Sequence, residues 1–311
     1  MFRPPAYLEA GASSSIRLRV LSLGAGVQST TLALMAAHGE IGPMPDCAIF
    51  ADTGWEPSAV YEHLAWLRSD NVLPFPVHVV SAGNIRANLM LAASGKRWAS
   101  IPAFTRTLVP ADAGILTVDG EDGAELVEIG TRCSPEVESI GMIRRQCTSE
   151  FKIVPIRRRV REMVGLAKRR SPDHPIVEQW IGISCDEIVR AKPSFEAWQV
   201  ARFSLIEKRV SRRDCLMWLR HHGYPEPPRS ACIGCPLHDD SRWRSRRDHD
   251  PEAWADAVEV DCAIRTGLRG IRGEVYLHRS AVPLDEVDLS TAADGDQLDL
   301  WGNECEGMCS V

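Results

Sequence analysis

The stretch Ser22-Leu-Gly-Ala-Gly-Val-Gln-Ser-Thr30 constrains the fold more than any other part of the chain. Residues 17–21 before it alternate as a buried strand does, and residues 31–37 after it carry apolar positions that suit a helix. A glycine turn between a strand and a helix lies at the helix N-terminus, where unsatisfied N–H groups and the positive end of the dipole attract anions. The stretch therefore predicts a cradle for a phosphate, pyrophosphate or sulfate.

The residues of this turn suit the same purpose. Gly24 and Gly26 lack the Cβ atoms that would keep an anion away from the backbone, and Ser22, Ser29 and Thr30 add hydroxyl donors. The turn lacks the lysine of a Walker loop and the third glycine of a dinucleotide fingerprint. An ordinary tight connection between a strand and a helix is therefore the alternative interpretation.

Strands and helices alternate after the turn. We expect a strand at 46–51 that ends in Asp52-Thr53-Gly54, a helix at 58–68, a strand at 77–80 and a helix at 83–93. This alternation predicts an α/β fold with a doubly wound, mostly parallel sheet. Because ligands bind at the carboxyl ends of such strands, both polar turns should open on one nucleotide-sized crevice.

The rest of the chain adds an insertion and an extension to this sheet. Segments 115–118 and 126–129 predict a hairpin, 151–166 and 211–222 predict helices, and 179–183 predicts a further buried strand. We expect a flexible arm at 1–15 and a nucleotide-binding domain at 16–210, with the hairpin insertion at about 100–146. A helical extension at 211–290, which contains Cys232-x-x-Cys235, and a mobile tail at 291–311 should follow.

Composition places the chain among ordinary globular proteins. It has 311 residues, 44% hydrophobic and 25% charged, with a net charge of −6 and ten cysteines. We see neither a signal peptide nor a membrane span, and so expect a cytoplasmic protein with no membrane partner. In that compartment the cysteines should serve as metal ligands, redox groups or core residues. Basic residues crowd 144–170 and 242–247, either as solvated helix faces or as a rim for a phosphorylated or nucleic-acid substrate.

Together these stretches resemble the PP-loop superfamily of adenine-nucleotide α-hydrolases (a HUP-like fold), and within it the phosphoadenosine phosphosulfate (PAPS) reductase family. Residues 22–30 are similar to the phosphate loop of that family, and Asp52-Thr53-Gly54 is similar to its DTG turn. Residues 147–156 resemble its C-C-x-x-R-K-V-x-P-L segment, with Cys147 on the first cysteine and Lys152, a candidate catalytic residue, on the lysine. Thr148 replaces the second cysteine.

The resemblance implies an iron–sulfur enzyme. Cys147, Cys232 and Cys235 match three of the four cysteines that hold a [4Fe–4S] cluster in that family, which would leave one iron open. The tail cysteines Cys305 and Cys309, or Cys133 or Cys215, are candidates to close the site. The alternatives to an iron–sulfur cluster are a zinc site that includes His238 and no metal at all.

The resemblance also implies roles for residues outside the cluster. Residues 182–190 are similar to a strand-end segment whose arginine meets the nucleotide's anions, so Arg190 is a candidate catalytic and binding residue, with Asp186 beside it. A surface ion pair between Arg190 and Glu187 is the alternative. Glu304-Cys305 echoes the family's nucleophilic tail, which makes Cys305 a candidate nucleophile, although a disulfide or metal contact with Cys309 would also explain it.

Two departures from the family divide the functional hypotheses. Gln28 stands where ATP-cleaving relatives carry a magnesium-binding aspartate, which favours a sulfonucleotide, whereas Thr148 argues against a standard reductase. The first hypothesis is a sulfonucleotide-reductase-like enzyme that uses a thioredoxin-like reductant. The alternatives are an ATP-dependent sulfurtransferase, with magnesium, a sulfur donor and a nucleic-acid or small-molecule acceptor, and a non-catalytic nucleotide-binding regulator. We expect a homo-oligomer in each case.

Overall fold

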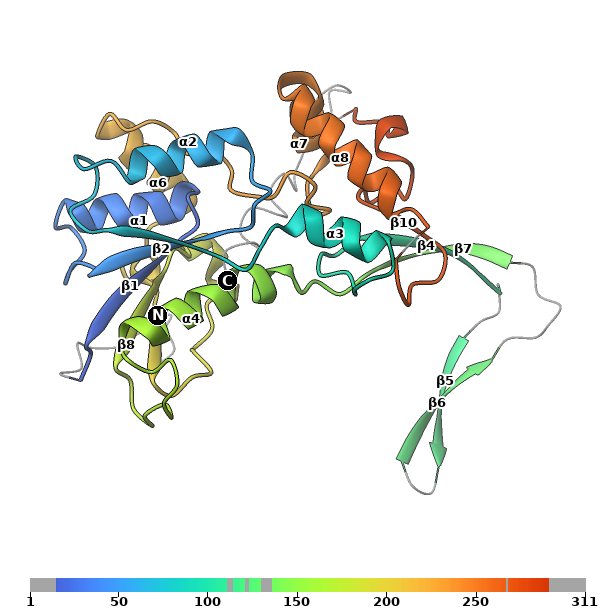
Figure 1. The fold of residues 1–311 in the computed structure, drawn as a ribbon, viewed down its shortest axis with the longest axis horizontal. Helices are drawn as coiled ribbons and strands as arrows, with labels where there is room; N and C mark the ends of the chain where they lie inside the picture. The colour runs from blue at the N-terminus through green and yellow to red at the C-terminus, as the bar shows by residue number, and fades with distance from the viewer. Residues whose placement is uncertain (1–14, 111–113, 121–122, 130–135, 267, 291–311) are drawn as a thin grey trace. The chain divides into compact units, whose positions relative to one another are not determined.

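The computed structural model describes residues 15–110, 114–120, 123–129, 136–266 and 268–290 (Figure 1). Within this part of the chain, residues 15–85 and 147–233 form one compact unit, and residues 86–146 and 234–290 form a second. These boundaries differ from the expected ones, since the inserted hairpin and most of the helical extension fall in the same unit. Residues 1–14 of the arm expected at 1–15, and the tail expected at 291–311 with Cys305 and Cys309, lie outside the described residues, as does Cys133.

A five-stranded sheet forms the centre of the first unit. Its strand order is β3-β2-β1-β8-β9 and every pairing is parallel. The bounds are β1 Leu18–Leu23, β2 Cys47–Asp52, β3 Val77–Ser81, β8 Val177–Ile181 and β9 Gln199–Arg202. The predicted α/β class with a parallel sheet is confirmed, and β9 is a strand that the sequence analysis did not anticipate.

Helices cover both faces of this sheet (Figure 1). The helices α1 (Val27–Ala37), α2 (Ser58–Leu67) and α6 (Arg212–His221) pack on one face, and α4 (Val154–Met163) packs on the other. A short helix, α5 (Ser204–Glu207), follows β9.

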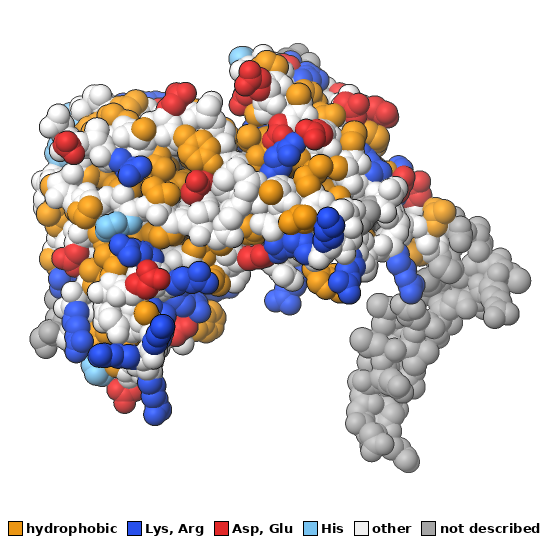
Figure 2. Space-filling view, in the orientation of Figure 1, with side chains coloured by type: hydrophobic (Ala, Val, Ile, Leu, Met, Phe, Trp, Pro, Cys, Tyr) orange, Lys and Arg blue, Asp and Glu red, His pale blue; other side chains and the backbone are white. Residues whose placement is uncertain are grey.

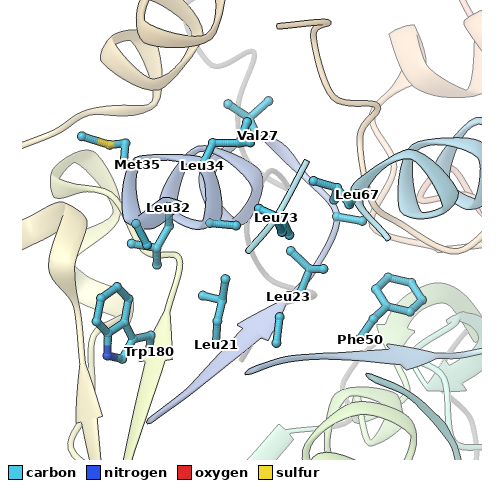
Figure 3. Packing of buried hydrophobic residues seen from close by; sticks show 14 of the residues in the cluster. Leu21, Leu23, Val27, Leu32, Leu34, Met35, Phe50, Leu67, Leu73 and Trp180 are labelled. Carbon is cyan, nitrogen blue, oxygen red and sulfur yellow. The ribbon is translucent and has the colours of Figure 1, made fainter. Parts of the chain in front are cut away.

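Alternate residues of the strands supply the two cores. Leu21, Leu23 and Phe50 point to the side of α1 (Figure 3), whereas Val20 and Ile49 pack with residues of α4. This division follows from the two-residue period of a strand, and burial on both faces explains why β2 is almost continuously apolar.

The strand order locates the candidate site. The chain runs from β1 through β2 to β3 on one side, and then returns to place β8 on the other side of β1. The carboxyl ends of β1 and β8 therefore meet where the order reverses, which is the position at which open parallel sheets bind ligands. The glycine turn follows β1, and residues 182–190 follow β8.

The second unit is built on antiparallel strands. The strands β10 (Glu274–Tyr276), β4 (Phe104–Pro110) and β7 (Glu136–Met142) form one sheet, and β5 (Gly114–Gly120) pairs with β6 (Gly123–Ile129) as the expected hairpin. The helices are α3 (Ile85–Ala93), α7 (Asp240–His249) and α8 (Pro251–Ile264). Of these elements, β4, β7 and β10 were not anticipated.

Candidate functional site

The turn between β1 and α1 presents backbone rather than side chains. Gly26 is the N-cap of α1 and supplies no side-chain acceptor to the first turn of the helix. A Cβ at this position would only meet Ser230 at the ordinary contact distance of 3.7 Å, so packing does not require a glycine there. Ala25 has a φ of 55°, an uncommon conformation for a residue with a Cβ and one often found at functional sites.

The hydroxyl groups around this turn are engaged within the protein. Ser29 Oγ accepts the N–H of Gly24 at 3.1 Å and donates to the carbonyl of Gly26 at 3.3 Å. Ser22 Oγ accepts a hydrogen bond of 2.6 Å from the side chain of Gln179 on β8. These bonds brace the turn from inside and across the sheet.

Thr30 is fully buried, and its hydroxyl lies 3.0 Å from Nε2 of His63 on α2. Burial lowers the pKa of His63 to about 4, so the imidazole is neutral near pH 7. The pair fixes the first turn of α1 against α2 without placing a charge beneath the site.

The loop after β8 approaches the first turn of α1 closely. A Cβ on Gly182 would lie 2.9 Å from both Cα and N of Ser29, which is closer than real Cβ contacts. Only glycine therefore allows this approach. This contact holds the loop after β8 against the first turn of α1, at the carboxyl edge of the sheet.

A polar network connects this loop to α1. Arg190 donates to Glu187 Oε2 at 2.7 Å, and Nε2 of Gln28 donates to the same oxygen at 3.3 Å. The guanidinium of Arg212 donates to Gln28 Oε1 at 3.4 Å, and Asp186 accepts the backbone N–H of Arg212 at 3.2 Å. The predicted residues Gln28, Asp186 and Arg190 thus lie together, and the ion pair between Arg190 and Glu187 is present.

The Asp52-Thr53-Gly54 turn at the end of β2 is rigidly held. Asp52 Oδ1 accepts the N–H of Gly54 at 2.7 Å and the hydroxyl of Tyr61 at 2.9 Å. Gly54 has a φ of +69°, and its carbonyl accepts a 2.7 Å hydrogen bond from the side chain of Asn84 in the loop after β3. The loops after β2 and β3 are therefore fixed to each other at the same edge of the sheet.

A buried carboxylate connects three of the predicted residues. The side chain of Glu56 is fully buried, and its Oε1 accepts a 3.1 Å hydrogen bond from Thr53. The ammonium of Lys152 lies 3.7 Å and the thiol of Cys232 lies 3.8 Å from the same oxygen, and Thr53 Oγ1 is 3.3 Å from the Cys232 sulfur. Lys152 belongs to a π-helical turn, Thr148–Ile153, that begins after Cys147 and runs into α4.

The three predicted cluster ligands are divided between the two units. Cys147 and Cys232 are half-buried residues of the first unit, and Cys235 belongs to the second. No group of three or more His, Cys, Asp or Glu side chains suited to a metal ion is present in the part of the chain that the structure describes. Three thiols are chemically suited to iron–sulfur or zinc ligation, and the cluster stays a prediction.

Two of the residues considered as additional metal ligands, Cys215 and His238, lie in the described part of the chain. Cys215 is fully buried in the core beside α1, where burial raises its pKa to about 12, which argues against its role as a ligand. His238 is a buried residue of the second unit whose ring meets Trp243 edge-on. The position of Cys305 is among those that the structure does not describe.

A cleft of about 230 Å³ lies between the end of β3 and the start of α4. Its lining includes Ser81, Pro155, Arg158 and Arg159. Basic side chains gather on the face that carries α4 and the loop after it (Figure 2), where Arg158, Lys168, Arg169 and Arg170 are exposed. The first unit thus has an electropositive face beside its sheet edge.

No protein-family model matches the chain, and no curated protein matches it either. The resemblance to PAPS reductases therefore depends on the sequence motifs alone. Among the described helices, none combines the length and apolarity that crossing a bilayer demands.

The sequence analysis missed several residues of this site. Glu56, His63, Gln179 and Arg212 all contact predicted site residues. Three of them, His63, Gln179 and Arg212, are distant in sequence from their partners, whereas Glu56 is only three residues from Thr53. Glu56 carried the clearest signal, because an acidic residue directly after a strand-end turn lies near the ligand edge of a parallel sheet.

Proposed function

We propose that the first unit binds an adenine nucleotide at the carboxyl edge of its sheet, with the nucleotide's anionic groups on the first turn of α1. The observation that carries this proposal is the uncapped first turn at Gly26, beside Arg190 and Arg212 at the point where the strand order reverses. The Asp52-Thr53-Gly54 turn borders the same edge and supplies a rigid wall for the nucleoside.

The reaction that this pocket supports best is sulfonucleotide reduction of the PAPS-reductase type. Gln28 donates its amide N–H to Glu187 and accepts from Arg212, so its carbonyl oxygen is already engaged and is a poor ligand for magnesium. A sulfonucleotide can react without the metal-bound triphosphate that ATP-cleaving relatives use. This favours the sulfonucleotide over ATP as substrate.

In the proposed reaction a cysteine thiolate, for which Cys305 is the candidate, attacks the sulfur of the sulfonucleotide. The new S–S bond replaces the sulfur–oxygen bond to the phosphate, and the adenine nucleotide leaves with that electron pair. A dithiol reductant then releases sulfite and becomes a disulfide, which regenerates the enzyme thiol. Arg190 and the first turn of α1 hold the phosphate of the leaving nucleotide.

Two measurements test this function. Calorimetric titration should give tighter binding of adenosine phosphosulfate than of ATP, with little effect of magnesium on either. Anaerobically purified protein should release sulfite when a thioredoxin-like dithiol is supplied, and iron and acid-labile sulfide counts on the same sample report whether a cluster is present. Absence of sulfite with an active reductant defeats the reductase, while retained nucleotide binding would preserve the binding site.

The second candidate is an ATP-dependent sulfurtransferase that acts on nucleic acid. The exposed basic side chains on and after α4 favour it. Binding of a fluorescent RNA or DNA hairpin should then weaken steeply as salt rises from 50 to 200 mM, by on the order of tenfold or more if several phosphates are contacted. Reversing Arg158 and Arg169 to glutamate should flatten that dependence.

A further inference from the structure

Glu187 places a negative charge where the proposed nucleotide would place its own. Its Oε2 accepts hydrogen bonds from both Arg190, at 2.7 Å, and Gln28, at 3.3 Å. Gln28 is the second residue of α1, so the carboxylate is hydrogen-bonded to a side chain from the first turn of that helix. The side chains of Glu187 and Arg190 are each only 18% exposed, which makes this a partly desolvated pair and not a loose surface contact.

The position of this pair matters because Arg190 is the arginine assigned to the nucleotide's anions. A guanidinium and a helix N-terminus both attract carboxylate and phosphate groups in the same way. Glu187 therefore satisfies, from within the chain, the charge requirement that a phosphate or sulfate satisfies on binding. An incoming anion meets this carboxylate as a competitor for Arg190 and as a like charge beside Gln28.

We propose that Glu187 is an internal counter-anion that a ligand must displace from Arg190, and that it thereby weakens the binding of ligands carrying a phosphate or sulfate while leaving the binding of uncharged nucleosides unaffected. The proposal rests on the proposed nucleotide site and deepens it. A nucleoside without an anionic group leaves the pair between Glu187 and Arg190 intact and gains nothing from the first turn of α1. A nucleotide must replace the contact between Glu187 and Arg190 with its own contact to Arg190, so Glu187 lowers the affinity of the site for nucleotides. The same pair keeps the site ordered when it is empty.

The ionisation of Glu187 gives the proposal a pH dependence. Burial raises the pKa of Glu187 and Asp186 raises it further, while Arg190 and Arg212 lower it, with a net upward shift. The groups facing it are therefore Asp186 and Arg190 on its own segment, Gln28 on α1 and Arg212 at the start of α6. As pH falls, Glu187 gains a proton at a higher pH than an ordinary glutamate and releases Arg190, so anion binding should strengthen.

The test compares Glu187→Gln with the wild-type chain by calorimetric titration of ATP, AMP and adenosine. Glutamine keeps the size and hydrogen-bonding capacity of the side chain and removes its charge, so the ATP affinity should rise about tenfold and the adenosine affinity should stay unchanged. Glu40→Gln, at the opposite end of α1, removes the same charge from an exposed residue and should change neither affinity. Thermal unfolding of each variant verifies that it is folded.

A second measurement uses the wild-type chain and inorganic sulfate, which keeps its charge between pH 5 and 8. Sulfate affinity should increase as the pH falls in the wild-type chain, and should vary less with pH in Glu187→Gln.

The outcomes separate the two proposals. If the wild-type chain binds ATP but Glu187→Gln binds it equally or more weakly, Glu187 positions Arg190 instead of competing with the ligand, and the inference is overturned while the nucleotide site stands. If the wild-type chain binds neither ATP, AMP nor adenosine phosphosulfate, the proposed function fails and the inference fails with it. Tighter ATP binding with unchanged adenosine binding supports both.

Discussion

His63 shows how a single buried side chain supports the site. It is 7% exposed, contacts the hydroxyl of Thr30 and has a pKa lowered to about 4. The sequence analysis assigned the Thr30 hydroxyl to a ligand, because nothing in a single sequence indicates that a residue 33 positions later lies beside it. Contacts of this kind depend on which helices pack together, and that is decided by the whole sheet.

The His63 pKa predicts a pH dependence of stability. The folded state disfavours the proton, so the stability linked to His63 is present above pH 6.5 and is lost as the pH falls toward 4, by up to about 3 kcal/mol. Urea unfolding at several pH values should show a shallower loss for His63→Gln than for the wild-type chain. His221→Gln, at an exposed histidine of α6, should keep the wild-type profile. Identical slopes for His63→Gln and the wild-type chain would contradict this account.

The strand–turn–helix elements of the first unit were predictable because their signals are local. Alternation and apolar runs located β1, β2, β3 and β8, and the glycine turn located the start of the site. The strand β9 was missed because its four residues, Gln199–Arg202, do not show the apolar pattern of a buried strand. The close approach of Gly182 to α1 was also missed, since it joins elements more than 150 residues apart.

Gly182→Ala tests this approach. A Cβ 2.9 Å from the backbone of Ser29 must push the loop after β8 away from the first turn of α1, which should lower the free energy of unfolding by about 1–3 kcal/mol. Gly26→Ala is the matched control, because its Cβ would make only ordinary contacts and its cost should not exceed the roughly 1 kcal/mol that alanine costs at an N-cap. Chemical denaturation of both variants measures the difference, and equal stability of the two would rule out the close packing described here.

At the scale of the whole molecule, the division into two units was the least predictable feature. The antiparallel pairing of β10 with β4 joins residues some 170 positions apart, and no local pattern announces it. The second unit is held instead by a buried carboxylate: Asp261 accepts the N–H groups of Leu277, at 2.7 Å, and Leu284, at 3.1 Å, and pairs with Arg265.

Asp261→Ala should therefore destabilise the second unit. Removing the carboxylate leaves two buried N–H groups and a guanidinium without this acceptor, at a cost of about 3–5 kcal/mol. Hydrogen exchange in β10 and α8 should accelerate sharply. Asp285→Ala, at an exposed residue directly after Leu284, should leave hydrogen exchange unchanged. Unaltered protection in Asp261→Ala would show that other contacts hold this unit.

Gly26→Asp tests most directly whether an anion of a nucleotide lies on the first turn of α1. The N-cap geometry at Gly26 suits aspartate, so this variant should be as stable as the wild-type chain or more stable by a few tenths of a kcal/mol. Its carboxylate would occupy the helix N-terminus and repel the ligand, so titration with adenosine phosphosulfate and ATP should show affinity lowered about tenfold or more. A folded Gly26→Asp protein that binds either nucleotide as tightly as the wild-type chain would contradict the account.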